Sequence, residues 1–204
     1  MCYTFVYGLK FRIGTEGSSI NLNTPNRLTL LRIVLIPVFV VFALLRAQWA
    51  QYVALLIYIL ACITDMLDGR IARARNLVTN FGKFADPIAD KLLVMSALVV
   101  LVASGRMPAW VCIMMLAREF IISGLRLVAA GNGRVIAAGK LGKLKTVFQM
   151  SATIALMLLV PVTGKALLGR FGVVLANVLM YIATVLTIVS GAEYILNNRD
   201  CIRE

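Results

Sequence analysis

The chain has 204 residues, of which 61% are hydrophobic and 15% are charged, and its mean hydropathy is +0.90. Soluble domains carry about a quarter charged residues, so this composition excludes an ordinary water-soluble globule. The chain contains no histidine, which excludes Ser-His-Asp triads, Cys-His dyads and histidine metal ligands. The four cysteines show no metal-ligand spacing and indicate no disulfide framework. Any catalysis must therefore use carboxylates, lysines, arginines or a cofactor.

Six apolar runs follow one another along the chain, each long enough to cross a bilayer once tilt and burial inside a bundle are allowed for. They cover residues 28–45, 51–64, 88–103, 108–130, 144–162 and 171–196. We therefore expect an all-α integral membrane protein, a bundle of six transmembrane helices. Residues 1–22 lack the apolar core of a signal peptide. We interpret them as a disordered or interfacial arm before a single membrane domain of residues 23–204.

The net charge of +12 follows from where lysine and arginine lie relative to these runs. If the amino terminus is cytoplasmic, most cations lie in the inner segments, and the outer turns carry only Arg46, Arg106, Lys165 and Arg170. This asymmetry is the positive-inside pattern of membrane proteins. It accounts for the basicity without nucleic acid, and it predicts a multi-pass protein of the cytoplasmic membrane.

The acidic residues carry the main functional signal. Five of the nine lie within or at the ends of apolar segments, namely Asp65, Asp68, Asp86, Asp90 and Glu119. A carboxylate at membrane depth costs at least ~2.5 kcal/mol, so such residues usually face a cavity, a partner or an ion. On a helix, Asp65 and Asp68 are separated by about 60°. Gly69 and Ala72 share their stripe, so one helix face is acidic and nearly free of bulk.

Asp86 and Asp90 lie one helical turn apart at the start of the next apolar segment, after a turn-like stretch at residues 76–82. Pro87 is tolerated between them if it lies in the first turn of that helix. Two helix ends that each present two carboxylates form an oxygen-only site, which suits Mg²⁺, Mn²⁺ or Ca²⁺. Four carboxylates exceed what one Mg²⁺ usually takes from protein, so we expect a pair of ions.

The spacing of these residues resembles a family signature. The pattern Asp65-x2-Asp68-Gly69-x2-Ala72-Arg73-x8-Gly82-x3-Asp86-x3-Asp90 matches the fixed positions of the CDP-alcohol phosphotransferase family. Three further segments, at residues 23–32, 117–120 and 142–146, are similar to the bacterial branch of the family that makes phosphatidylglycerophosphate. The resemblance spans about residues 23–150, and the last apolar segment looks generic.

The resemblance implies an enzyme that moves the phosphatidyl group from CDP-diacylglycerol to glycerol 3-phosphate, releasing CMP and forming phosphatidylglycerophosphate. It also implies two divalent cations, Mg²⁺ or Mn²⁺, a homodimer, and a cytoplasm-facing active site in the bacterial inner membrane. By the family pattern Asp65, Asp68 and Asp86 are metal ligands, and Asp90 is both a metal ligand and the general base. The implied donor contacts are Asn26, Thr29, Asp68, Gly69, Ala72, Arg73 and Gly82.

Cations beside the fourth and fifth apolar segments favour a phosphorylated acceptor, and they are Arg118, Arg126, Lys143 and Lys145. Phosphate is bound by the arginine fork and by the lysine point charge, whereas a neutral alcohol needs no such cluster. Simpler interpretations remain open. The lysines also suit membrane anchoring, Arg118 suits an ion pair with Glu119, and Asp86 suits a helix cap. Arg32, one turn into the first segment, is expected to extend to the membrane interface.

Other function classes are also compatible with acids in a membrane bundle. Within the enzyme class, the alternative acceptors are an inositol phosphate or serine. A divalent-cation transporter needs acids along a path through the bilayer, but the outer turns carry none. A non-catalytic lipid-binding scaffold does not need small residues at Gly69, Ala72 and Gly82. Release of CMP with one alcohol and not another separates these classes.

Overall fold

The computed structural model describes residues 24–75, 80–131, 139–162 and 166–198, with side chains at residues 30–64, 88–89, 91–131, 139, 141–162 and 166–198. Over these ranges the chain forms helices and no strand. The helices are α1 (Thr24–Leu44), α2 (Gln48–Arg75), α3 (Asn80–Ala103), α4 (Ala109–Gly131), α5 (Lys140–Leu159) and α6 (Gly169–Asn197). The prediction of an all-α bundle of six helices is confirmed for the described part of the chain.

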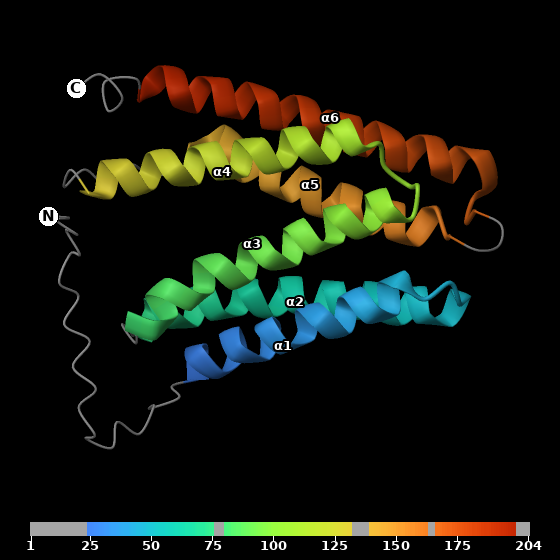
Figure 1. Cartoon of the computed structure of the whole chain (residues 1–204), viewed down its shortest axis with the longest axis horizontal. Helices are drawn as coiled ribbons and strands as arrows, with labels where there is room; N and C mark the ends of the chain where they lie inside the picture. The colour runs from blue at the N-terminus through green and yellow to red at the C-terminus, as the bar shows by residue number, and fades with distance from the viewer. Residues whose placement is uncertain (1–23, 76–79, 132–138, 163–165, 199–204) are drawn as a thin grey trace, which may run out of the picture.

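The helices alternate in direction and form two groups (Figure 1). In one group α1 packs against α2 and α3, and in the other α6 packs against α4 and α5, while α2 and α3 also contact α5. The starts of α1, α3 and α5 lie at the same end of the bundle as the ends of α2, α4 and α6. We call this the Asp end, because the aspartate-bearing turns of α2 and α3 lie there, and the other the opposite end.

Helices α2 and α3 extend furthest beyond the apolar runs that predict them. Helix α2 continues past Thr64 to Arg75, and α3 begins at Asn80, well before Ile88. The turn expected at residues 76–82 is therefore helical from Asn80, and the condition that Pro87 lies in the first turn of its helix is not met. Hydropathy marks the apolar part of a helix, whereas backbone hydrogen bonding continues through the polar turns beside it.

The core of the first group is built on one stripe of α1. Arg32, Ile36, Phe39 and Ala43 recur at helical spacing and are all buried. The Phe39 ring packs on Tyr58 of α2, with the ring centroids 5.7 Å apart. Arg32 is only 1% exposed, so the prediction that it extends to the interface is wrong. Its position on the packed stripe turns the side chain into the bundle.

The outer surface of the bundle is apolar on every helix. Large exposed hydrophobic side chains include Val34, Leu56, Val99, Phe120, Val147 and Phe171. Apolar surface of this extent marks contact with a partner or a membrane. Among the described residues, one helix, α6, is both long and apolar enough to cross a bilayer, and shorter apolar helical stretches occur at residues 30–44, 48–64 and 91–103. The helix count predicted from the sequence is thus confirmed, and the six membrane crossings stay a prediction.

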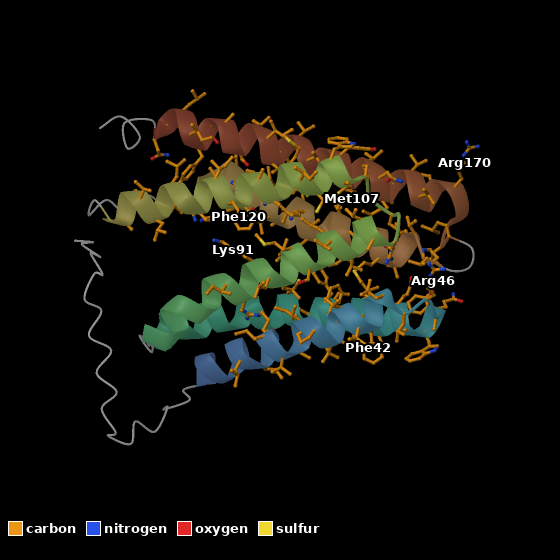
Figure 2. The ribbon with its side chains drawn as sticks, viewed as in Figure 1. Phe42, Arg46, Lys91, Met107, Phe120 and Arg170 are labelled. Carbon is orange, nitrogen blue, oxygen red and sulfur yellow. The ribbon has the colours of Figure 1, made fainter. Side chains whose placement is uncertain are left out.

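The opposite end carries the connections between helices and several cations, with Arg46 and Arg170 at its rim (Figure 2). Arg106, between α3 and α4, is buried there. Its Nε donates to Ser104 Oγ at 2.9 Å, and its Nη1 donates to the Val160 carbonyl at 3.4 Å. Burial lowers the pKa of Arg106 to about 10, so the guanidinium stays protonated at neutral pH and ties the α3–α4 connection to the end of α5.

Candidate functional site

The aspartate quartet lies on two helices that contact each other. Asp65 and Asp68 belong to the last turns of α2, and Asp86 and Asp90 to the first half of α3. Both of these parts lie at the Asp end of the bundle (Figure 1). The four side chains lie outside the described residues, as do those of the predicted donor contacts Asn26, Thr29, Gly69, Ala72, Arg73 and Gly82. Their metal and donor roles stay predictions.

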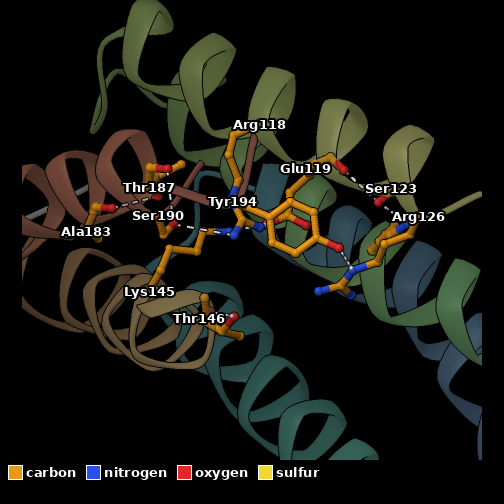
Figure 3. Close-up of polar contacts among 12 residues, drawn as sticks. Arg118, Glu119, Ser123, Arg126, Lys145, Thr146, Ala183, Thr187, Ser190 and Tyr194 are labelled. Atoms are coloured by element: carbon orange, nitrogen blue, oxygen red, sulfur yellow. Dashed lines mark hydrogen bonds and ion pairs between the residues drawn. The ribbon is translucent and has the colours of Figure 1, made fainter. Parts of the chain in front are cut away.

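Glu119 of α4 joins two of the predicted phosphate-binding cations. Its Oε1 accepts a hydrogen bond from Arg118 Nη1 at 3.3 Å and a second from Lys145 Nζ of α5. The Lys145 side chain is 2% exposed and that of Glu119 is 24% exposed. An ammonium at such depth is stable when a carboxylate pairs with it. The expected ion pair of Arg118 with Glu119 is thus present. Glu119 also pairs with the buried Lys145, a contact that the sequence does not predict (Figure 3).

Arg118 also contacts α6, and small residues leave room for it. Its Nη2 donates to Ser190 Oγ at 3.4 Å. A Cβ placed on Gly191 would lie 3.0 Å from Arg118 Cγ, and one on Gly142 would lie 3.5 Å from Nη2. The Nε of Arg118 is buried without a hydrogen-bond partner among the described residues. Side chains from α4 and α6 therefore fix the guanidinium from two sides, while one of its nitrogens keeps an unused donor.

Arg126 lies two turns further along α4 and contacts a second residue of α6. Its Nε donates to the Tyr194 hydroxyl at 3.1 Å, and its guanidinium carbon lies 5.3 Å from the centre of the Tyr194 ring. The second contact is within the range of a cation–π interaction. Tyr194 and Ser190 lie one turn apart on α6, so this helix holds both arginines.

Two cavities flank these ion pairs. The larger, of about 180 Å³, lies between α4, α5 and α6, and we call it the arginine cavity. Its lining includes Arg118, Arg126, Ser190, Glu193, Tyr194 and Asn197. The smaller, of about 60 Å³, lies between α3, α4 and α5, and we call it the lysine cavity. Its polar lining is Lys91, Glu119, Lys145, Thr146 and Gln149.

The lysine cavity contains hydrogen-bond donor groups that no sequence motif predicts. Lys91 extends from α3 toward α4 (Figure 2), and its Nζ donates to Ser123 Oγ at 2.6 Å. Ser123 Oγ in turn donates to the Glu119 carbonyl at 2.6 Å. The Nε2 of Gln149 is buried without a hydrogen-bond partner among the described residues. Lys91 follows Asp90 directly in α3, so this cavity and the predicted metal site involve the same part of that helix.

The four cations predicted to bind the acceptor do not all line the same cavity. Arg118 and Arg126 line the arginine cavity, and Lys145 lines the lysine cavity. Lys143 is exposed in the first turn of α5 and lines neither of these two cavities. Sequence reasoning missed the α6 contribution entirely, because Ser190 and Tyr194 lie in an apolar run that carries no motif.

No group of three or more His, Cys, Asp or Glu side chains gathers among the residues that the structure describes. The half-buried carboxylate of Glu119, which lines the lysine cavity, is paired with lysine and arginine. Of the residues considered, the aspartate quartet on α2 and α3 offers the donor set that suits a hard divalent cation.

Comparison with known proteins places this arrangement in a family. Residues 22–189 match the CDP-alcohol phosphatidyltransferase family. A match of this extent, which includes both aspartate pairs and the cations of α4 and α5, shows that the chain belongs to that family. The family resemblance inferred from the sequence signature is confirmed.

Three similar curated proteins are named for the same activity. A Bacillus subtilis protein named CDP-diacylglycerol–glycerol-3-phosphate 3-phosphatidyltransferase is 42% identical over 193 residues, which are 89% of this chain and 97% of the relative. A Rickettsia prowazekii protein of the same name is 41% identical over 175 residues, 86% of this chain and 94% of the relative. A Mycobacterium tuberculosis protein named probable phosphatidylglycerophosphate synthase is 42% identical over 176 residues, 85% of this chain and 80% of the relative.

Proposed function

We propose that this chain is a CDP-diacylglycerol–glycerol-3-phosphate 3-phosphatidyltransferase. It transfers the phosphatidyl group of CDP-diacylglycerol to glycerol 3-phosphate, releases CMP and forms phosphatidylglycerophosphate, a step of phospholipid biosynthesis. The family match and the names of relatives at about 40% identity support the reaction class and both substrates.

The observation that carries the acceptor assignment is the arginine cavity. Arg118 and Arg126 line it together, and Glu193 is the carboxylate among its lining residues. Two guanidinium groups against one carboxylate leave the cavity net positive, which suits a phosphorylated acceptor and gives no advantage to neutral serine. Its volume of about 180 Å³ accommodates a small polyol phosphate. The Lys145–Glu119 ion pair beside Arg118 is neutral overall and leaves this charge balance unchanged.

The proposed metal site consists of Asp65 and Asp68 of α2 with Asp86 and Asp90 of α3. Register on two contacting helices supports it, because each pair falls on one helix stripe at the same end of the bundle. An all-carboxylate donor set in a chain without histidine fits Mg²⁺ or Mn²⁺. When bound, two such ions neutralise charge on the transferred phosphate and on the departing CMP.

The residues of the chain supply positioning and proton transfer. Asp90 accepts the proton of the acceptor hydroxyl as that oxygen bonds to the phosphorus that carries diacylglycerol. The bond between this phosphorus and the CMP oxygen breaks, and CMP leaves with the electron pair. We assign the nucleotide to the small residues Gly69, Ala72 and Gly82, where larger side chains would occupy its space. Asn26, Thr29 and Arg73 are the remaining proposed donor contacts.

We further propose that residues 23–204 form one membrane domain, with six crossings and the Asp end at the cytoplasmic side of the bacterial inner membrane. The apolar outer surface and the long apolar helix α6 support this setting. A lipid donor also requires an active site at the membrane surface. The homodimer implied by the family resemblance belongs to the same proposal.

A panel of acceptors tests the proposed function. Purified protein in detergent receives CDP-diacylglycerol and Mg²⁺ with glycerol 3-phosphate, inositol 1-phosphate or serine in parallel, and CMP release is measured. We expect CMP with glycerol 3-phosphate and only background with the other two. Release with inositol phosphate or serine instead would overturn the acceptor assignment. Release with none of the three would favour a transporter or a scaffold.

A further inference from the structure

Tyr194 occupies a position on α6 that the proposed reaction does not by itself explain. It is 8% exposed, although it lies in the last turn of its helix among exposed neighbours. Its ring and its hydroxyl are both directed to one partner, the Arg126 guanidinium of α4. Figure 3 draws Tyr194 beside Arg126, at the wall of the arginine cavity. A buried tyrosine directed to a cation in a cavity wall has a role in orienting that cation.

Arg126 needs such orientation because its side chain is exposed. An exposed arginine samples many rotamers, and binding an anion in one of them costs side-chain entropy. The Tyr194 hydroxyl accepts the hydrogen bond from Nε, and the ring lies against the guanidinium carbon. These contacts leave the two terminal nitrogens, which are the ones that bind phosphate oxygens in bidentate fashion. The tyrosine therefore fixes the arginine in a form that is ready to bind.

The same helix holds the other arginine of the cavity. Ser190, one turn before Tyr194, accepts from Arg118 Nη2 at 3.4 Å. Arginine side chains on a helix lean toward its amino terminus, so Arg126 leans along α4 toward Arg118. Contacts with one turn of α6 therefore hold both guanidinium groups at the wall of one cavity.

We propose that Tyr194 is a positioning residue for the acceptor's phosphate, and that α6 thereby sets the preference for a phosphomonoester over a neutral alcohol. This inference rests on the proposed function and extends it to a helix outside the signature. Tyr194 acts through Arg126: it presents the guanidinium fork to the phosphate while the acceptor's hydroxyl faces the aspartates. Its loss should weaken acceptor binding and leave donor binding and the chemical step intact.

The test compares the parent enzyme with Tyr194→Phe, Tyr194→Leu and a matched control, Tyr181→Phe. Tyr181 lies on the same helix, is 46% exposed and stacks on Trp110, with the ring centroids 6.1 Å apart, away from the arginine cavity. Initial rates of CMP release are measured against glycerol 3-phosphate at saturating CDP-diacylglycerol, and then with the two roles exchanged. A neutral alcohol, glycerol, is assayed beside them as an acceptor.

Loss of one pre-ordered side chain is expected to raise the KM for glycerol 3-phosphate roughly two- to tenfold in Tyr194→Phe. Tyr194→Leu, which also loses the ring, should raise it further. The kcat and the KM for CDP-diacylglycerol should stay within about twofold, and Tyr181→Phe should match the parent. An unchanged KM for glycerol 3-phosphate, or an equal rise for both substrates, overturns the proposal, because the second result indicates general structural damage.

A second measurement needs no turnover. Phenylglyoxal labels exposed arginines, and inorganic phosphate bound at the fork should protect Arg126, as followed by peptide mass spectrometry. In Tyr194→Phe, the phosphate concentration that halves the labelling of Arg126 should be several-fold higher than in the parent. If the parent releases no CMP with glycerol 3-phosphate, the proposed function fails, and the protection data still decide the role of Tyr194. Equal protection in parent and variant, or no protection in the parent, contradicts that role.

Discussion

The ion pair between Glu119 and Lys145 allows a quantitative prediction about stability. Glu119→Gln keeps the size of the side chain and removes its charge. The Lys145 ammonium, 2% exposed, then has no anion at the carboxylate position. Breaking a fully buried pair in this way costs about 3–5 kcal/mol. Because Glu119 is 24% exposed and glutamine still offers an oxygen to Lys145, we expect a smaller loss, about 2 kcal/mol, in the free energy of unfolding.

A double-mutant cycle with Lys145→Met isolates the pair. Methionine fills a similar volume without a charge, so the double variant buries no ammonium at this position. We expect the double variant to be more stable than Glu119→Gln alone, with a coupling energy of about 1–2 kcal/mol. The assay is reversible unfolding of the purified protein in mixed detergent micelles. Glu193→Gln, which changes an exposed carboxylate, is the control and should shift stability by less than about 0.5 kcal/mol.

The size of the coupling energy decides whether the two side chains interact. If the two single losses add within about 0.3 kcal/mol, Glu119 and Lys145 do not interact as the structure has them. The same outcome would remove the link between the arginine and lysine cavities, because that link consists of the two contacts of Glu119 Oε1.

Two further predictions concern the aspartates and a glycine. Asp90→Asn should abolish CMP release while binding of CDP-diacylglycerol persists, whereas Asp65→Asn should also weaken Mg²⁺ affinity. Equal turnover in Asp90→Asn and in the parent enzyme would contradict the role of Asp90 as the general base. Gly191→Ala should raise the KM for glycerol 3-phosphate severalfold, since a Cβ there lies 3.0 Å from Arg118 Cγ. The control is Gly124→Ala, because a Cβ added at Gly124 lies within 4 Å of no other atom. This variant should leave the KM for glycerol 3-phosphate unchanged and raise helix stability by up to about 1 kcal/mol. Similar kinetics for the two variants would show that Arg118 can move away from the added Cβ without loss of acceptor binding.

The fold was predictable where hydrophobicity alone determines it. Apolar runs separated by short polar connections predict the number and order of the helices. They do not predict where α2 ends or where α3 begins, because these turns are polar and still helical. They also do not predict which way Arg32 points. Helix α1 is apolar on nearly every face, so its sequence does not indicate the face that packs against α2 and α3.

The candidate site was predictable where its residues are local in sequence. The aspartates follow a spaced signature, and Arg118 with Glu119 are neighbours. The pairing of Glu119 with Lys145, and of the arginines with Ser190 and Tyr194, joins different helices and leaves no periodic signal. Such contacts depend on how α4, α5 and α6 pack. A single hydroxyl in an apolar run gives no indication of its partner.

The most direct measurement of the central claim follows the acceptor's oxygen. Protein freed of metal with EDTA receives CDP-diacylglycerol and glycerol 3-phosphate labelled with ¹⁸O at its primary hydroxyl, with and without added Mg²⁺. We predict equal amounts of CMP and phosphatidylglycerophosphate, with the label in the new phosphodiester, and neither product until the ion is restored. Labelled CMP, phosphatidic acid in place of phosphatidylglycerophosphate, or full turnover without a divalent cation would contradict metal-dependent phosphatidyl transfer to glycerol 3-phosphate.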